Sequence, residues 1–254
     1  MKPIRKDPAG FKTTELKNAR ILAGLVTDFE ELFLRVIERK PPRELAAPKK
    51  FTFDLAAYYE AIDAIEGFID KDPANKAAET VTVASVNHGR MWADKSMGAF
   101  GITANAPVAG AKPYYLPPEQ RMIDMYEAKA LSEIKGLTGY QATNLKREML
   151  ESFKAGETIN QITKRVKSVT GKSTNKAITI ARTETLAAGN AAAKERYKGA
   201  GVERVEWVAA YDDRVCEECE SKHGETFDID DAPELPVHPN CRCTLVPVMT
   251  APEE

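Results

Sequence analysis

The stretch Cys216–Cys243 begins with C-E-E-C and ends with H-P-N-C-R-C, and eighteen residues separate Cys219 from His238. These two motifs hold all four cysteines of the 254-residue chain and one of its three histidines. A two-residue gap lets two side chains reach one metal ion, and two such pairs complete a tetrahedron. The stretch therefore predicts a metal site that closes a small C-terminal subdomain.

The predicted ligands are Cys216 and Cys219 from the first motif and His238 and Cys241 from the second, which repeats the same gap. Cys243 is a fifth candidate, because alternate residues of an extended segment face the same side. This soft ligand set favours zinc, and ligands supplied entirely by protein are typical of a structural site. Reduced thiols or disulfides are the alternative. Clustered cysteines without a visible signal peptide favour the metal.

The residues before this stretch show apolar side chains at helical spacing, and those after Gly201 alternate as in strands. We expect an α+β fold with mainly helical N-terminal and middle regions and a small C-terminal β subdomain closed by the Cys/His site. The expected strands lie in V-E-R-V-E-W-V-A-A, T-F-D-I and C-T-L-V-P-V. The expected helices begin at Thr13 or Thr14, at Asp54 and after Pro73, and then cover 117–135, 141–155, 159–171 and 173–197.

Stretches rich in proline and glycine suggest where the chain divides. The segment P-P-R-E-L-A-A-P-K-K ends at residue 50, and a Gly-, Ala- and Pro-rich segment runs from Gly98 to Pro118. We expect an N-terminal helix and linker in 1–50, a helical region with a long loop in 51–116, and a third domain in 117–250 that ends in the metal site.

Charge is unevenly distributed along the chain. Residues 141–205 carry 13 Lys and Arg against 6 Asp and Glu, whereas residues 206–254 carry 3 against 13. The basic segment can face phosphates, an acidic protein, the acidic tail of its own chain or solvent. The acidic tail opposes contact between the metal block and nucleic acid, which argues against a free zinc-ribbon adaptor.

Several function classes lack their signals. No apolar run reaches the eighteen residues of a membrane span, so we expect no membrane contact. No Ser/His/Asp set, phosphate-binding glycine loop or H-E-x-x-H occurs. Asp212 and Asp213 precede Cys216, where we expect a turn and contacts around the ligands rather than hydrolysis. His88 and Trp92 are expected to pack together rather than to bind a ligand.

The residues from about Pro117 onward resemble the phage minor head proteins of the Mu-F-like head morphogenesis family. The resemblance rests on I-A-R-T-E-T at Ile180–Thr185, Asn190, Tyr197, Gly201-Val202, Trp207, D-D-R-V-C-E-E-C at Asp212–Cys219, Gly224 and H-P-N-C-R-C at His238–Cys243. It carries the family's structural motif over to Arg182, Thr183, Glu184, Thr185, Trp207 and Asp212.

The resemblance implies a non-enzymatic minor capsid protein that joins the portal vertex of a tailed-phage head during assembly in the host cytoplasm. It implies a role in DNA packaging or ejection, a place in the virion head, and the portal protein and other head proteins as partners. From their net positive charge, residues 141–205 are the expected contact with packaged DNA or with the portal. The alternative is a phage-associated enzyme or toxin domain, ADP-ribosyltransferase-like, that uses Arg182 and Glu184. These two side chains point about 200° apart on a helix, which favours two separate anchors.

Overall fold

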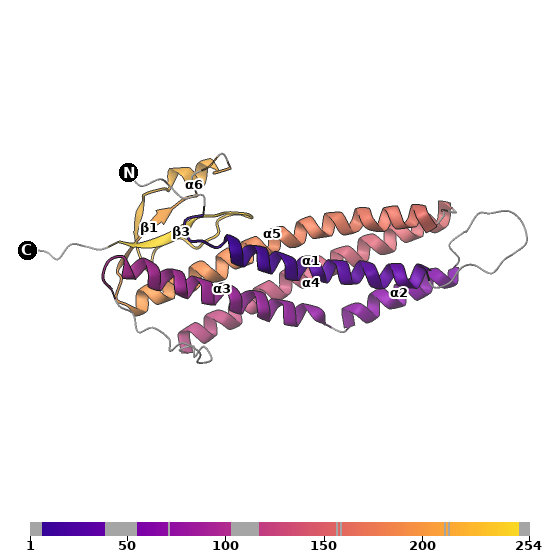
Figure 1. Cartoon of the computed structure of the whole chain (residues 1–254), viewed down its shortest axis with the longest axis horizontal. Helices are drawn as coiled ribbons and strands as arrows, with labels where there is room; N and C mark the ends of the chain where they lie inside the picture. The colour runs from indigo at the N-terminus through magenta and orange to yellow at the C-terminus, as the bar shows by residue number, and fades with distance from the viewer. Residues whose placement is uncertain are drawn as a thin grey trace, which may run out of the picture. The chain divides into compact units, whose positions relative to one another are not determined.

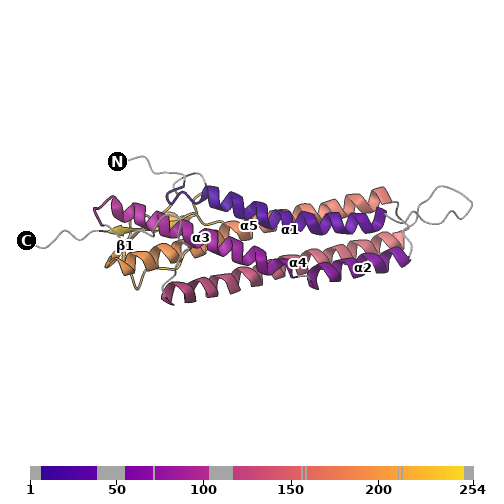
Figure 2. The same ribbon diagram turned by 60° about the horizontal axis from the view of Figure 1, so that its bottom comes forward.

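The computed structural model describes residues 7–38, 55–70, 72–102, 117–155, 157, 159–210, 212 and 214–248. This part of the chain is mostly helical and ends in a small antiparallel sheet (Figures 1 and 2). The long helices are α1 (Lys12–Glu38), α2 (Leu55–Asp70), α3 (Pro73–Gly98), α4 (Pro117–Ala155) and α5 (Ile159–Gly199). They are followed by β1 (Arg204–Val208), α6 (Glu217–Ser221), β2 (Thr226–Asp228) and β3 (Thr244–Val248).

The three predicted strands are confirmed, but the predicted number of helices in 117–199 is wrong. Helix α4 continues through Gly136 and Gly139, and α5 continues through Gly171, where the sequence predicted breaks. A glycine costs only about 1 kcal/mol relative to alanine inside a helix. That cost is too small to end a helix whose neighbouring turns pack into a core. The proposed cap Asp54, the linker 41–50 and most of the loop 98–118 lie outside the described residues.

Helix α1 begins one turn after Asp7, and not at a threonine cap as predicted. The carboxylate of Asp7 accepts hydrogen bonds from the backbone N–H groups of Phe11 (3.0 Å) and Lys12 (2.9 Å). A carboxylate is well suited to this position, because the first N–H groups of a helix have no partner within the helix. Phe11 itself is fully buried, so this cap also fixes an apolar anchor.

The described chain forms two compact units. Unit 1 consists of Met1–Asn18, Glu79–Ala130 and Ala181–Glu254, and unit 2 consists of Ala19–Ala78 and Leu131–Ile180. In unit 2, parts of α1, α2, α4 and α5 pack around one apolar core. The buried members of that core are Phe29, Ile65, Ala142, Leu145, Ile162, Val166 and Val169.

Unit 1 contains the sheet, whose strand order is β2-β1-β3 with both pairings antiparallel. Trp207 on β1 faces Leu245 on β3, and both side chains are buried. The same core includes Met97 of α3 and Tyr197 of α5, both fully buried. The sheet is therefore held against the C-terminal halves of two long helices.

Helices α3 and α5 approach most closely at two glycines. A Cβ atom added at Gly89 would overlap the backbone carbonyl of Gly189, and one added at Gly189 would overlap the ring of Phe11. Near this contact, the buried amide of Asn18 donates to the hydroxyls of Thr185 (2.8 Å) and Ser85 (3.1 Å). The helix packing thus depends on small side chains and on buried polar groups with partners.

His88 is packed, as predicted. Its Nε2 lies 3.1 Å from the carbonyl oxygen of Ala9, and its Nδ1 lies 3.1 Å from the hydroxyl of Thr14. The ring also lies against that of Phe11, with 4.4 Å between centroids. Because a carbonyl oxygen only accepts, Nε2 is the donor in the contact with Ala9.

Candidate metal centre

Cys216, Cys219 and His238 come together as the sequence predicted. Cys216 precedes α6, and its Sγ accepts a hydrogen bond from the backbone N–H of Cys219 (3.4 Å). The Nε2 of His238 lies 3.3 Å from the Sγ of Cys216 and 3.2 Å from that of Cys219. Three potential ligand atoms therefore converge, although eighteen residues separate the two motifs.

Cys241 and Cys243 complete the cluster through Cys219. The Sγ atoms of Cys219 and Cys241 are 3.9 Å apart, and those of Cys219, Cys241 and Cys243 all lie within 4.8 Å of one another. Ligands about 2.3 Å from a tetrahedral zinc are separated by roughly 3.8 Å. The sulfur spacing therefore fits a tetrahedral ion. All four cysteines are free thiols, so the cluster contains no disulfide.

The orientation of His238 fits a role as a metal ligand. Its Nδ1 lies 2.9 Å from the carbonyl oxygen of Pro239, which makes Nδ1 the protonated nitrogen. The lone pair of Nε2 is then directed toward the two sulfurs. Such a hydrogen bond on the far nitrogen is the usual way in which a ligating histidine is held.

A cavity of about 10 Å³ lies among these ligand atoms. That volume holds about one sphere of the size of a water molecule or an ion. Its lining includes all five candidate ligands: Cys216, Cys219, His238, Cys241 and Cys243. The donor types and the size of this cavity fit a soft metal ion, and the ligand atoms form two groups of three, Cys216/Cys219/His238 and Cys219/Cys241/Cys243, that share Cys219.

Local electrostatics favour thiolates at two of the cysteines. The pKa of Cys216 is lowered, mainly by the backbone N–H of Cys219, and that of Cys241 is lowered to about 5, mainly by a hydrogen bond from Cys243. Burial raises the pKa of Cys219 to about 12, and the hydrogen bond with Cys241 raises that of Cys243. The thiolate is the metal-binding form, so a cation here would favour deprotonation of the remaining thiols.

Asp212 holds the two ligand segments together. Its carboxylate accepts bonds from both terminal nitrogens of Arg242, at 2.5 and 2.7 Å, and from Arg214 at 3.0 Å. The side chain of Asp212 is only 6% exposed. These arginine contacts, above all that with Arg242, hold the pKa of Asp212 well below its usual range. The residue is thus engaged in ion pairs beside the cluster.

One face of α5 holds the second motif in place. We expected Arg182 and Glu184 to anchor this helix to the metal-bound subdomain, but the contacts come from three other residues. The hydroxyl of Thr183 accepts from the backbone N–H of Asn240 (3.3 Å), whose φ is 60°. Asn190 donates to the carbonyl of Cys243 (3.3 Å), and the hydroxyl of Tyr197 lies 3.4 Å from the carbonyl of Leu245.

The spacing of Thr183, Asn190 and Tyr197 explains this arrangement. They are seven residues apart along the helix, which places them on one side of α5. Their partners, Asn240, Cys243 and Leu245, come in the same order along the second motif and the start of β3. The regular spacing of seven is the signal from which this contact could have been predicted.

The other residues of the R-T-E-T segment have different surroundings. Arg182 is exposed, whereas Glu184 is buried and pairs with Lys129 of α4 at 3.6 Å. Thr185 is fully buried and donates to the carbonyl of Ala181 (2.6 Å). The Nδ1 of His223 accepts a hydrogen bond from the backbone N–H of Ala209 at 3.3 Å.

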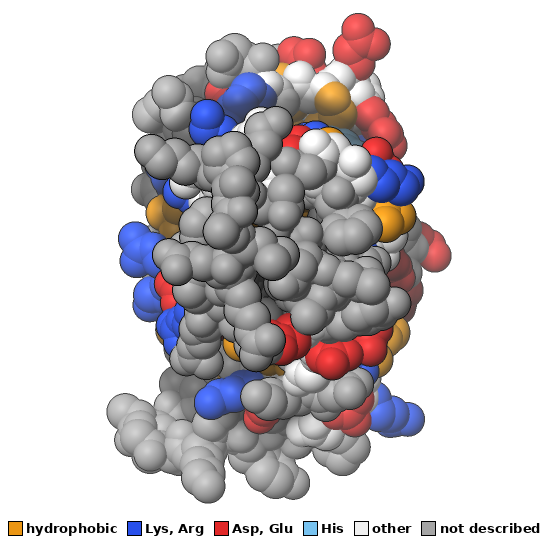
Figure 3. Space-filling model, turned by 90° about the vertical axis from the view of Figure 1, so that its right-hand side faces the viewer, with side chains coloured by type: hydrophobic (Ala, Val, Ile, Leu, Met, Phe, Trp, Pro, Cys, Tyr) orange, Lys and Arg blue, Asp and Glu red, His pale blue; other side chains and the backbone are white. Residues whose placement is uncertain are grey.

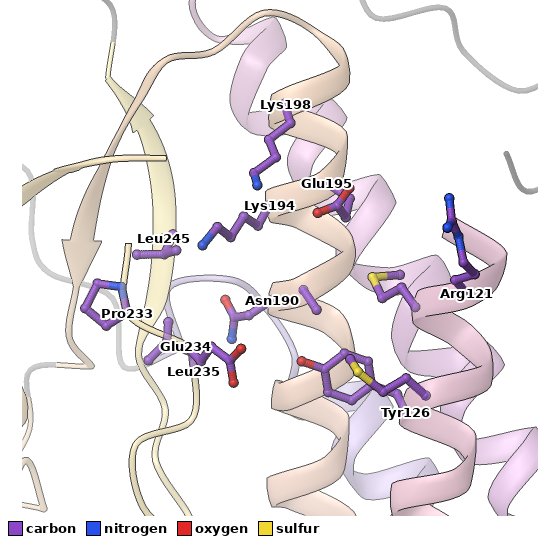
Figure 4. A pocket seen from close by; sticks show the side chains of 13 residues that line it. Arg121, Tyr126, Asn190, Lys194, Glu195, Lys198, Pro233, Glu234, Leu235 and Leu245 are labelled. Carbon is purple, nitrogen blue, oxygen red and sulfur yellow. The ribbon is translucent and has the colours of Figure 1, made fainter. Parts of the chain in front are cut away.

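A second cavity of unit 1 lies between α4, α5 and the segment before the second motif (Figure 4). Its volume is about 370 Å³, within the range of small-molecule sites. Lys194 donates to the carbonyl of Ala232 (3.0 Å), and Lys198 pairs with Asp230 (2.6 Å). Burial raises the pKa of Tyr126 to about 12. Burial also lowers the pKa of Lys194.

Comparisons with known proteins agree with the sequence motifs. Residues 143–246 match the family described as Phage Mu protein F like protein, and the resemblance predicted from the motifs is confirmed. This segment contains the R-T-E-T residues and the complete cluster of candidate ligands. Among the described residues, every helix is too short or too polar to cross a membrane.

A curated protein of Haemophilus influenzae, described only as uncharacterized, is also similar. It is 24% identical over 239 residues, which cover 87% of this chain and 52% of that protein. The chain thus spans about half the length of this relative. No solved structure matches the chain.

Proposed function

We propose that this chain, whose residues 143–246 are a Mu-F-like segment, is a structural minor capsid protein of a tailed-phage head. The observation that carries the proposal is the family match itself, whose part in unit 1 is joined by side-chain contacts. Within it, Thr183 and Asn190 of α5 hydrogen-bond to the segment that contains Cys241 and Cys243. We assign the minor head domain to residues 117–250.

The Cys/His cluster has a structural role in this proposal. We propose that Cys216, Cys219, His238 and Cys241 hold one zinc ion, with Cys243 as the competing ligand. Cys219 belongs to both groups of three ligand atoms that lie close together. Zinc would supply a crosslink between the segment before α6 and the segment before β3. Binding of this kind contributes on the order of 10 kcal/mol to the folding of small zinc domains. The ion would therefore keep the small sheet folded against α3 and α5.

The expected place of action is the portal vertex, with the portal protein and other head proteins as partners during assembly and DNA packaging or ejection. The enzyme alternative gains no support from the surroundings of its key residues. Glu184 forms an ion pair with Lys129, and Asp212 forms one with Arg242. Both acids are therefore engaged by basic side chains of the same chain.

The proposal is tested by isolating heads from cells that produce the phage with a tagged copy of this chain. We expect the chain to co-sediment with heads and to be crosslinked to the portal protein. A Cys219→Ser copy should be incorporated less well, because its C-terminal subdomain lacks the metal crosslink. A Lys17→Ser copy is the matched control, since Lys17 is exposed and far along the sequence from the cluster. A chain that is absent from purified heads would contradict the proposal.

A further inference from the structure

The first half of α5 is basic and contains no acidic residue. Between Ile159 and Ile180 the chain has five Lys and Arg and no Asp or Glu. These five residues are Lys164, Arg165, Lys167, Lys172 and Lys176. Figure 3 shows Lys and Arg side chains at both edges of the face drawn there, with more of them on the left. This half of the helix lies in unit 2 and has no part in the metal centre.

A cavity of about 320 Å³ lies between this part of α5 and the second half of α4. Four of its lining residues are basic, and only Glu148 is acidic. Asn144 and Ser168 add neutral hydrogen-bonding groups. The full lining is Tyr140, Asn144, Arg147, Glu148, Lys164, Arg165, Ser168, Val169 and Lys172, and we call it the basic groove.

Ion pairs within unit 2 show which of these cations are already neutralised. Arg165 bonds to Glu157 at 2.7 and 2.8 Å and to Glu148 at 2.8 Å. These contacts with Arg165 lower the pKa of both carboxyl groups, so the acids are charged and engaged. Lys164 and Lys172 are exposed and take part in none of the ion pairs of the described residues. These two ammonium groups are therefore the ones available to bind an anion at the groove.

An aromatic ring stands at the same groove. Tyr140 is 39% exposed, and the ammonium of Lys176 lies 4.8 Å from the centre of its ring. This cation–π contact holds Lys176 on the side of the helix that carries Lys164 and Lys172. The three lysines are eight and four residues apart, so they extend the positive surface beyond the groove itself.

We infer that the basic groove binds the phosphate backbone of double-stranded DNA without reading its sequence. From Lys164 to Lys176 the helix rises about 18 Å, which requires several phosphates rather than one. Lysine, arginine, serine and asparagine are common donors to phosphate oxygens. An acidic protein segment would meet the same charges, but the neutral donors Asn144 and Ser168 beside them favour phosphate oxygens, which commonly accept from such side chains. The inference deepens the proposed function and rests on it only for the source of the DNA.

The test measures binding of the full chain to a fluorescent 30-base-pair duplex over a range of salt concentrations. The variant is Lys164→Gln with Lys172→Gln, and the control is Lys17→Gln with Lys95→Gln, which removes two exposed lysines of unit 1. We expect the groove variant to bind roughly tenfold more weakly, with a salt slope smaller by about 2, because two phosphate contacts are lost. The control variant should bind like the original chain.

Three results would overturn the inference: no binding of the duplex at low salt, equal weakening in both variants, or tighter binding of poly-glutamate than of DNA at equal charge. The last result would assign the groove to an acidic protein partner. A variant with Lys164→Arg and Lys172→Arg must retain binding, which separates lost charge from lost folding. Incorporation into heads is scored separately. Failure of DNA binding in a chain that still enters heads would reject only this inference.

Discussion

Arg242 donates to both carboxylate oxygens of Asp212, at 2.5 and 2.7 Å. Arg242 stands between Cys241 and Cys243, and Asp212 stands four residues before Cys216. The pair therefore joins the two segments that supply the candidate ligands, independently of any metal. A paired, planar contact of this kind fixes orientation as well as distance.

Asp212→Asn should lower the thermal midpoint of unfolding at pH 7. The folded-state pKa of Asp212 is depressed, mainly by Arg242, so its stabilisation is present above the unfolded value of about 3.9 and is lost as pH falls below it. The difference in thermal midpoint between the original chain and the variant should therefore become smaller below about pH 4. Thermal melts followed by circular dichroism at several pH values measure this difference.

Asp228→Asn is the control for that experiment. Asp228 is 74% exposed and lies 3.6 Å from Arg204, and exposed pairs of this type contribute little. A difference for Asp212→Asn that stays constant from pH 7 to pH 3 would show that the ion pair with Arg242 does not act as described.

Metal analysis of ligand variants decides which four side chains bind. We expect one zinc per chain in the original protein and none in Cys219→Ser, because Cys219 belongs to both groups of converging ligand atoms. If His238 completes the tetrahedron, His238→Ala loses the metal and Cys243→Ser keeps it. If Cys243 completes it, the two results are reversed. Cobalt substitution provides an independent readout, since absorption bands from sulfur ligands grow with their number. A full equivalent of metal in Cys219→Ser would contradict the assignment.

Asn190→Ala should destabilise the C-terminal subdomain by about 1–3 kcal/mol, because two buried polar groups lose the side chain to which they are hydrogen-bonded. Its amide nitrogen donates to the carbonyl of Cys243, and its oxygen accepts from the hydroxyl of Thr244 at 2.8 Å. Denaturant unfolding measures the loss. Asn175→Ala is the matched control on the same helix, where the side chain is exposed and we expect a change below about 0.5 kcal/mol.

Much of the candidate site could be predicted from the sequence, because short spacings determine it. The first two-residue gap places Cys216 beside Cys219, whereas the ligand atom of His238 lies with those of Cys216 and Cys219 rather than with that of Cys241. The alternation of β3 residues accounts for the burial of Leu245. The ion pair of Asp212 with Arg242 could not be predicted, since thirty residues separate the two. Nothing local selects Arg242 over Arg214 as the main partner.

The helix boundaries show a different limit. Gly136, Gly139 and Gly171 each weaken a helix locally, and a local rule predicts a break at each. The packed residues on either side, such as Leu137 and Val169, are fully or almost fully buried and continue the same helices. The free energy gained by tertiary packing exceeds the local cost of the glycine. One sequence alone does not show which helices will be packed on both sides of a glycine.

Gly89→Ala and Gly136→Ala should change stability in opposite directions. A methyl group at Gly89 would overlap the carbonyl of Gly189, so α3 and α5 must separate, at a cost of about 1–3 kcal/mol or more. Gly136 has no atom within 4 Å of an added Cβ, so alanine there should stabilise α4 by up to about 1 kcal/mol. Both glycines are helical, and both substitutions add one methyl group. Denaturant unfolding of the two variants therefore isolates the close approach of α3 and α5, and a stable Gly89→Ala chain would show that this approach is not needed.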